Sequence, residues 1–173
     1  MEKLLRSIDA INRFIGRIAS ISAFFLVLVV FFDVLMRYLF KKSWVFTQEL
    51  EWHIFAFLFL MAAGYTLLQD AHVRVDILYQ NLSPRVKAWI NLIGTLFFLI
   101  PGCLMVIDTS FKFTLNSYLI KEGSPDPGGI PFRFLIKGCI PVGFSLLLLQ
   151  GIAMGIRSLL VLLGKGGSEV EGR

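Results

Sequence analysis

Two histidines and two cysteines are the side chains of this 173-residue sequence best suited to bind a metal, a haem or a redox partner. His53 and His72 flank one apolar stretch, and the helix between them would hold them about 28 Å apart at 1.5 Å per residue. They therefore cannot share a haem iron or a metal ion, whose ligands must meet at one depth. Cys103 and Cys139 are isolated and form no CxxC pair. We therefore expect no cofactor, no metal and no enzyme activity.

Three acidic residues each precede a basic residue by four positions, the spacing that brings two side chains together on one helix face. The pairs are Asp33 with Arg37, Glu49 with His53, and Asp108 with Lys112. Three interpretations remain open for them: ion pairs that fix the depth of helix ends, contacts of Asp33, Arg37 and Glu49 with a partner subunit, or a buried proton relay. No ionisable residue lies near the middle of an apolar stretch, where transporters place ion and proton sites.

The composition identifies the solvent for which these residues are built. Hydrophobic residues make up 56% of the chain and charged residues 17%, against about 25% charged in an ordinary soluble domain. Four stretches carry no charge: 18–32, 52–69, 88–107 and 138–156. A helix that crosses the hydrocarbon layer needs roughly 20 such residues, and lipid leaves helices as the expected form. We predict an all-α integral membrane protein, a single domain over 1–173 with spans at about 16–36, 50–69, 87–107 and 135–162.

Four spans place both termini on one side of the membrane. The terminal side then carries ten of the seventeen lysines and arginines and the other side seven. The positive-inside rule therefore predicts cytoplasmic termini and an outer loop over 112–131. No basic patch with interleaved aromatic residues is present in the sequence, which excludes nucleic acid as an expected partner.

Two segments outside the spans have apolar residues at helical spacing. They cover about 3–14, before the first span, and about 75–83, between the second and third. Amphipathic helices of this kind lie in the membrane plane, and their basic residues meet anionic lipid. We predict two in-plane helices on the cytoplasmic side, with membrane lipid as their partner; the alternation over 72–76 also fits a short extended piece.

The fourth span carries the clearest helix-packing signal. Gly151 and Gly155 form a GxxxG motif, which lets two helices approach closely in lipid. In the third span, Pro101-Gly102 predicts a kink. Three functional classes remain open for such a chain: an accessory or scaffold subunit, a small transporter or channel that self-assembles through Gly151 and Gly155, and a membrane anchor for a redox complex.

A series of short motifs resembles a known family. Its parts are Arg37-Tyr38-Leu39-Phe40, then Trp44, then Glu49-Leu50, then Gly64, then His72-Val73-Arg74-Val75-Asp76. In their order and spacing they resemble the DctQ-like small membrane subunit of tripartite ATP-independent periplasmic (TRAP) transporters. The resemblance marks Tyr38, Trp44, His72, Arg74 and Asp76 as motif residues.

The resemblance implies a role in the bacterial inner membrane. Members of the family pair with a large membrane subunit that carries the substrate and sodium sites, and a periplasmic binding protein delivers the substrate. The small subunit extends the static scaffold and does not itself bind substrate. The substrates are organic anions such as sialic acids or C4-dicarboxylates, and no residue of this sequence distinguishes between them.

Overall fold

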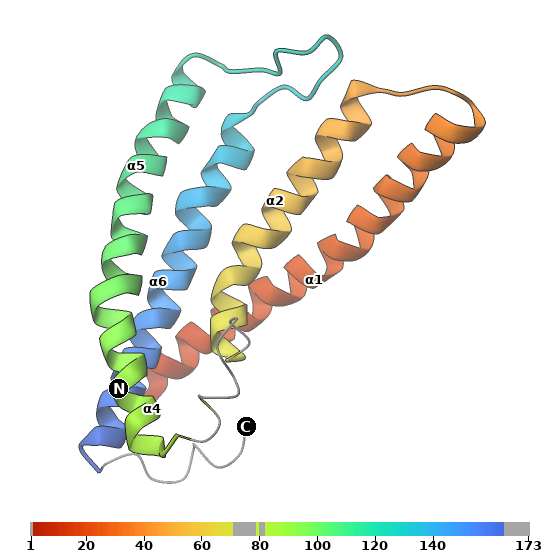
Figure 1. The fold of residues 1–173 in the computed structure, drawn as a ribbon. Coiled ribbons are helices and arrows are strands. Elements are labelled where there is room, and N and C mark those ends of the chain that lie inside the picture. The colour runs from red at the N-terminus through yellow and green to blue at the C-terminus, as the bar shows by residue number, and fades with distance from the viewer. Residues whose placement is uncertain (1, 71–78, 80–81, 165–173) are drawn as a thin grey trace.

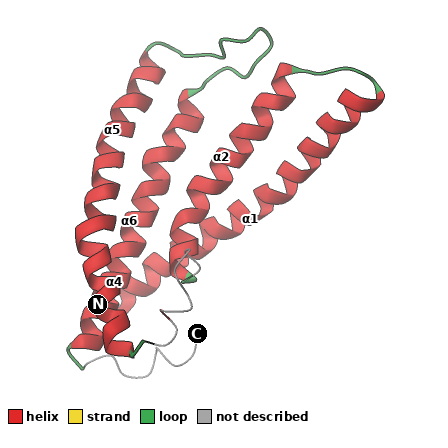
Figure 2. Cartoon of the chain, in the orientation of Figure 1, coloured by secondary structure: helices red, strands yellow, loops and turns green. Residues whose placement is uncertain are grey.

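The protein is described by a computed structural model that covers residues 2–70, 79 and 82–164. The described chain is helical and contains no strand (Figure 1, Figure 2). Its elements are α1 (Glu2–Leu39), α2 (Val45–Leu68), α4 (Pro84–Gly94), a π-helical segment η1 (Thr95–Leu99), α5 (Ile100–Leu119) and α6 (Phe134–Leu162). The segments α4, η1 and α5 join into one run, Pro84–Leu119, so that four helices are long and apolar enough to span a membrane. The predicted all-α, four-span class is confirmed.

Local sequence explains where the helices begin and end. Ser83 caps α4 because its hydroxyl accepts the Val86 N–H, and Pro84 supplies the first helical residue. Four helices end with a residue of positive φ two positions beyond their last residue. These residues are Lys41, Asp70, Lys121 and Gly164. This left-handed residue satisfies the last helical carbonyls and turns the chain away.

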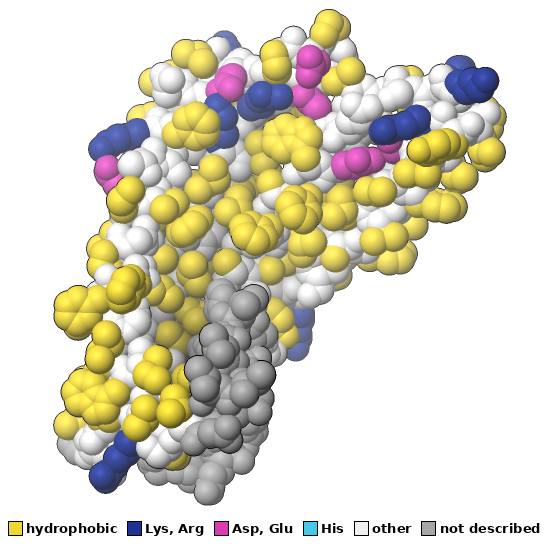
Figure 3. Space-filling view, in the orientation of Figure 1, with side chains coloured by type: hydrophobic (Ala, Val, Ile, Leu, Met, Phe, Trp, Pro, Cys, Tyr) yellow, Lys and Arg dark blue, Asp and Glu magenta, His cyan; other side chains and the backbone are white. Residues whose placement is uncertain are grey.

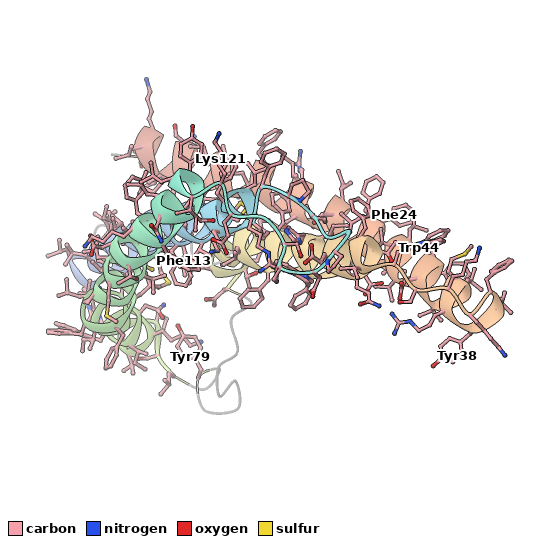
Figure 4. All side chains as sticks on the ribbon, turned by 90° about the horizontal axis from the view of Figure 1, so that it is seen from above. Phe24, Tyr38, Trp44, Tyr79, Phe113 and Lys121 are labelled. Atoms are coloured by element: carbon pink, nitrogen blue, oxygen red, sulfur yellow. The ribbon has the colours of Figure 1, made fainter. Side chains whose placement is uncertain are left out.

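The helices form a layer rather than a closed bundle. α5, α6 and α2 stand side by side, and α1 crosses this row obliquely (Figure 1, Figure 4). The connections 40–44 and 120–133 lie at one end of the layer, called here the loop end. α1 begins and α6 ends at the opposite, terminal end, where α1 contacts α6 as well as α2. α6 is the central member and the most buried of the four.

The first amphipathic segment is part of α1 and not a separate helix. α1 runs without a break through 3–14 and the first span, so the prediction of an independent N-terminal helix is wrong. No proline interrupts it, and Leu5 and Ile8 pack against Ala153 of α6, which continues the contacts of the span. The second predicted in-plane helix, over 75–83, falls largely outside the described residues.

The Pro101-Gly102 pair lies just after the π-helical segment. Pro101 has no N–H to donate, and the N–H of the preceding residue, Ile100, bonds to the Thr95 carbonyl, five residues back. The wider π turn faces Gly151 and Gly155 of α6. A Cβ on Gly151 would lie 2.3 Å from Leu99, and one on Gly155 would lie 3.3 Å from Thr95. The GxxxG face is therefore covered by η1 of the same chain.

Candidate functional site

Charged side chains gather at the loop end, and hydrophobic side chains cover the middle of the layer (Figure 3). The central acid at the loop end is Glu49, in the first turns of α2 and only 4% exposed. Its carboxylate accepts hydrogen bonds from the Ser124 hydroxyl at 2.5 Å, the Ile130 N–H at 2.5 Å and the Arg133 guanidinium at 3.1 Å. All three donors belong to the 120–133 connection. We call these four residues the Glu49 cluster.

The Glu49 cluster requires a glycine beside it. A Cβ on Gly129 would lie 2.3 Å from the Ser124 hydroxyl and 2.7 Å from the Glu49 carboxylate. Arg133 also lies over the Trp52 ring, 5.6 Å from its centroid, in cation–π geometry. The GSPDPGG sequence at 123–129, which lies within the predicted outer loop, is thus folded onto the start of α2. Figure 4 shows it reaching from α5 across the layer toward Trp44.

A second ion pair closes the base of the same connection. Lys137, in the first turn of α6, pairs with Glu122 and lies 3.9 Å from the centroid of the Phe113 ring. The Arg133 N–H also donates to the Glu122 carbonyl at 3.1 Å. The ammonium of Lys137 lowers the pKa of Glu122 below its usual value of 4.5.

Stability should therefore depend on pH through Glu122. Because its pKa is lower in the folded state, the Lys137 contact stabilises the protein above pH 4.5, and this contribution is lost as pH falls through the folded-state value. Lys137→Met should reduce the acid-side fall of the unfolding midpoint, measured in detergent between about pH 6 and pH 3. Lys112→Met is the control, since its pair with Asp108 is exposed; equal acid profiles for Lys137→Met and the wild type would contradict the assignment.

The predicted pair of Asp33 and Arg37 forms at the loop end of α1. Asp33 is 2% exposed and also accepts a hydrogen bond from the Thr47 hydroxyl of α2 at 3.0 Å. The pair therefore joins two helices and does more than set the depth of one. Trp44, which precedes α2, stacks on Phe32 with ring centroids 6.2 Å apart. Tyr38 points away from the layer (Figure 4).

The other two predicted pairs have different outcomes. Asp108 and Lys112 form an exposed ion pair at 2.7 Å. The prediction for Glu49 and His53 is wrong, because the Glu49 carboxylate turns toward the 120–133 connection. His53 instead places Nδ1 2.6 Å from the backbone carbonyl of Glu49 and lies against Trp52. A carbonyl only accepts, so Nδ1 carries the proton.

A buried polar group at the terminal end has no counterpart in the sequence analysis. Asp9 accepts from the Arg157 guanidinium at 2.7 Å and from the Gln150 amide at 3.2 Å. The Asn12 amide donates to Gln150 at 3.0 Å, and Asn12 is 1% exposed. These four residues, the Asp9 cluster, join α1 to α6. A signal was available: Asp9 and Asn12 share a helix face at i, i+3, and Gln150 is a polar residue inside an uncharged span.

Removing Arg157 should destabilise the α1–α6 contact. Arg157→Ala leaves the Asp9 carboxylate without its cation, at an expected cost of about 1–3 kcal/mol for a pair whose arginine is one-third exposed. Asp9→Asn in the same chain should restore part of the loss, because no buried charge is then left unpaired. Thermal unfolding in detergent measures both, with the exposed Arg13→Ala as control. An additive double variant would contradict the pairing.

The remaining predicted residues fall into two groups. His72, Arg74 and Asp76 lie outside the described residues. Gly151 and Gly155 are buried against η1, so the structure brings them together with Leu99 and Thr95 and not with the loop-end residues. Asp33, Arg37, Trp44 and Glu49 do gather at the loop end, around the start of α2. The loop end is therefore the region in which the structure brings several of the predicted residues together.

Fold and site together define a class of protein. The described part of the chain is an open layer of four helices long and apolar enough to span a membrane, with buried polar residues both inside the helices and near their ends. Residues 26–160 match the family model described as "Tripartite ATP-independent periplasmic transporters, DctQ component". The chain belongs to this family, which is a family of transporter subunits and not of enzymes.

A curated relative agrees with the family assignment. The chain is 30% identical over 116 residues to a protein of Haemophilus influenzae named "Putative TRAP transporter small permease protein". The aligned region covers 65% of this chain and 71% of the relative. The resemblance seen in the motif series is thus confirmed at the level of the family.

Proposed function

We propose that this chain is the scaffold subunit of a sodium-driven TRAP transporter in a bacterial inner membrane. In this proposal it pairs with the large membrane subunit, which binds substrate and sodium. A periplasmic binding protein delivers an organic anion, of the sialic acid or C4-dicarboxylate type, to the loop end. The termini then lie in the cytoplasm, in agreement with the excess of basic residues there.

The observation that carries this proposal is the open layer of helices. α1 and α5 lie at opposite edges of the layer at the loop end (Figure 1, Figure 4). The described helices therefore do not close into a ring around a pore. Exposed apolar side chains run along α1, α2 and the α4–η1–α5 helix. Such surfaces suit lipid and the flank of a larger membrane protein. The GxxxG face, on which self-assembly was argued, is covered from within the chain.

Copurification and uptake test the proposal directly. We expect the chain and the large subunit encoded with it to copurify in detergent, and cells that lack this chain to lose uptake of the organic anion. Reconstituting the chain alone should give no flux. Separate elution of the two subunits, or full uptake without this chain, would contradict the proposal.

A further inference from the structure

A groove opens between α1 and α2 in the loop-end half of the layer. Its volume is about 470 Å³, and its walls are almost entirely apolar. This volume lies within the roughly 300–1,000 Å³ typical of sites for small molecules. The walls consist of Ser22, Phe25 and Val29 from α1 and Leu50, His53, Ile54 and Phe57 from α2.

The groove exists because the two helices are joined above and below it. Toward the terminal end, Ala19 packs against Met61 with its small side chain fully buried, which holds the helices close. Toward the loop end, Asp33 accepts the Thr47 hydroxyl. His53 is held to its own helix through Nδ1 and Trp52, so its ring forms part of the wall.

One stripe of α1 leads from the groove to a cation. Ser22, Phe25, Val29, Asp33 and Arg37 follow each other at intervals of three or four residues and so share a helix face. From Ser22 to Arg37 the stripe is about 22 Å long at 1.5 Å per residue. That length matches half of a bilayer whose full thickness with headgroups is about 40–45 Å. The apolar groove would therefore lie at the depth of lipid chains and Arg37 at the depth of headgroups.

Arg37 has hydrogen-bonding capacity to spare. Its side chain is 48% exposed, and in the described chain only Asp33 is recorded as its partner. A guanidinium presents five N–H donors in a fork that matches phosphate oxygens. Two carboxylates stand beside it, Asp33 and, within electrostatic range, Glu51. These acids disfavour a ligand with net negative charge and favour one that carries an ammonium next to its phosphate.

We propose that the α1–α2 groove binds one zwitterionic glycerophospholipid. An acyl chain lies along Phe25, Val29 and Phe57, and the lipid phosphate accepts hydrogen bonds from Arg37. The headgroup ammonium lies on the side of the Glu51 carboxylate, while the buried Asp33 carboxylate stays bonded to Arg37 and Thr47. Trp44, stacked on Phe32 at the loop end, lies at the interfacial level where indole rings are favoured. The lipid fills the groove that lies between the contact of Ala19 with Met61 and the hydrogen bond of Thr47 to Asp33.

Quantifying retained lipid tests this assignment without any transport assay. The chain is purified in detergent, and bound phosphatidylethanolamine and phosphatidylglycerol are measured by native mass spectrometry and lipid extraction. We expect about one phosphatidylethanolamine per chain in the wild type, and at least about tenfold less in Val29→Trp, whose indole fills the groove. Val27→Trp is the matched control, because Val27 is 65% exposed and lies two residues away on another face of α1. It should retain lipid like the wild type.

A photo-crosslinking amino acid at position 29 gives a second readout, in the complex with the large subunit. A lipid adduct supports the proposal, and an adduct to a helix of the large subunit overturns it by identifying a protein occupant. Equal lipid in Val29→Trp and Val27→Trp also overturns it, as does a wild type that retains none or retains phosphatidylglycerol equally well. Copurification with the large subunit is a separate result, so failure of the lipid site leaves the scaffold proposal to its own test.

Discussion

Replacing Glu49 with alanine is expected to release the 120–133 connection from α2. The substitution removes the acceptor of three hydrogen bonds and leaves the Arg133 guanidinium, at 24% side-chain exposure, without its carboxylate. Removing one member of this ion pair leaves the other charge without its partner, so the unfolding midpoint in detergent should fall. Hydrogen exchange at the Ile130 amide should rise as well, because that amide donates to Glu49.

Two further variants separate the charge of Glu49 from its shape. Glu49→Gln keeps the size of the side chain and one acceptor oxygen but loses the charge toward Arg133, so its effect should be intermediate. Asp126→Ala removes an exposed acid of the same connection and should change stability by less than about 0.5 kcal/mol. A Glu49→Ala protein with wild-type Ile130 protection and an unchanged midpoint would show that the connection is held by other contacts.

Replacing Gly143 with alanine is expected to force α2 and α6 apart. A Cβ at this position would lie 2.6 Å from the Leu60 carbonyl oxygen and 3.0 Å from its carbon. These are backbone atoms within α2, so the contact cannot be relieved by rotating a side chain. Overpacking of this kind costs typically 1–3 kcal/mol, and here it acts on the central contact of the layer. The unfolding midpoint in detergent should fall by several degrees.

The chain offers matched controls for Gly143. Gly94 and Gly102 are also helical, and a Cβ at either would meet nothing within 4 Å. Alanine at these positions should leave stability unchanged or raise it by about 0.5–1 kcal/mol, since alanine is the better helix former. A uniform response of all three sites would show that close approach between helices is not what requires Gly143.

Apolar stretches predicted the number of helices because the hydrocarbon layer requires nearly every residue of a span to be uncharged and helical. They could not predict that residues 3–14 continue into the first span. The same amphipathic face suits a helix in the membrane plane and a helix packed against another helix. In the structure, contacts with Ala153 and Arg157 of α6 place the 3–14 segment against α6. Similarly, the glycine spacing of Gly151 and Gly155 predicts close packing but not its partner, which is the π-helical segment of the same chain.

At the loop end, too, local spacing predicted one contact, and the others depend on the fold. Asp33 and Arg37 are four residues apart in one helix, so local spacing was enough to predict their pair. Glu49 bonds to residues 75 to 84 positions further along the chain. That contact depends on α2 and α6 being neighbours in the layer, and no local pattern contains this information. Sequence identified Glu49 as a residue to examine, and the fold supplied its partners.

The oblique course of α1 has a mechanical consequence. Two parallel helices that touch only along their sides can slide along their axes. A third helix that crosses both of them and bonds to each opposes this movement. α1 is such a crossing helix. At one end its Asp9 bonds to Arg157 of α6, and at the other end its Asp33 accepts the Thr47 hydroxyl of α2. Sliding of α6 along α2 would therefore have to break one of these two contacts. This resistance to sliding is a property that the proposed scaffold role requires.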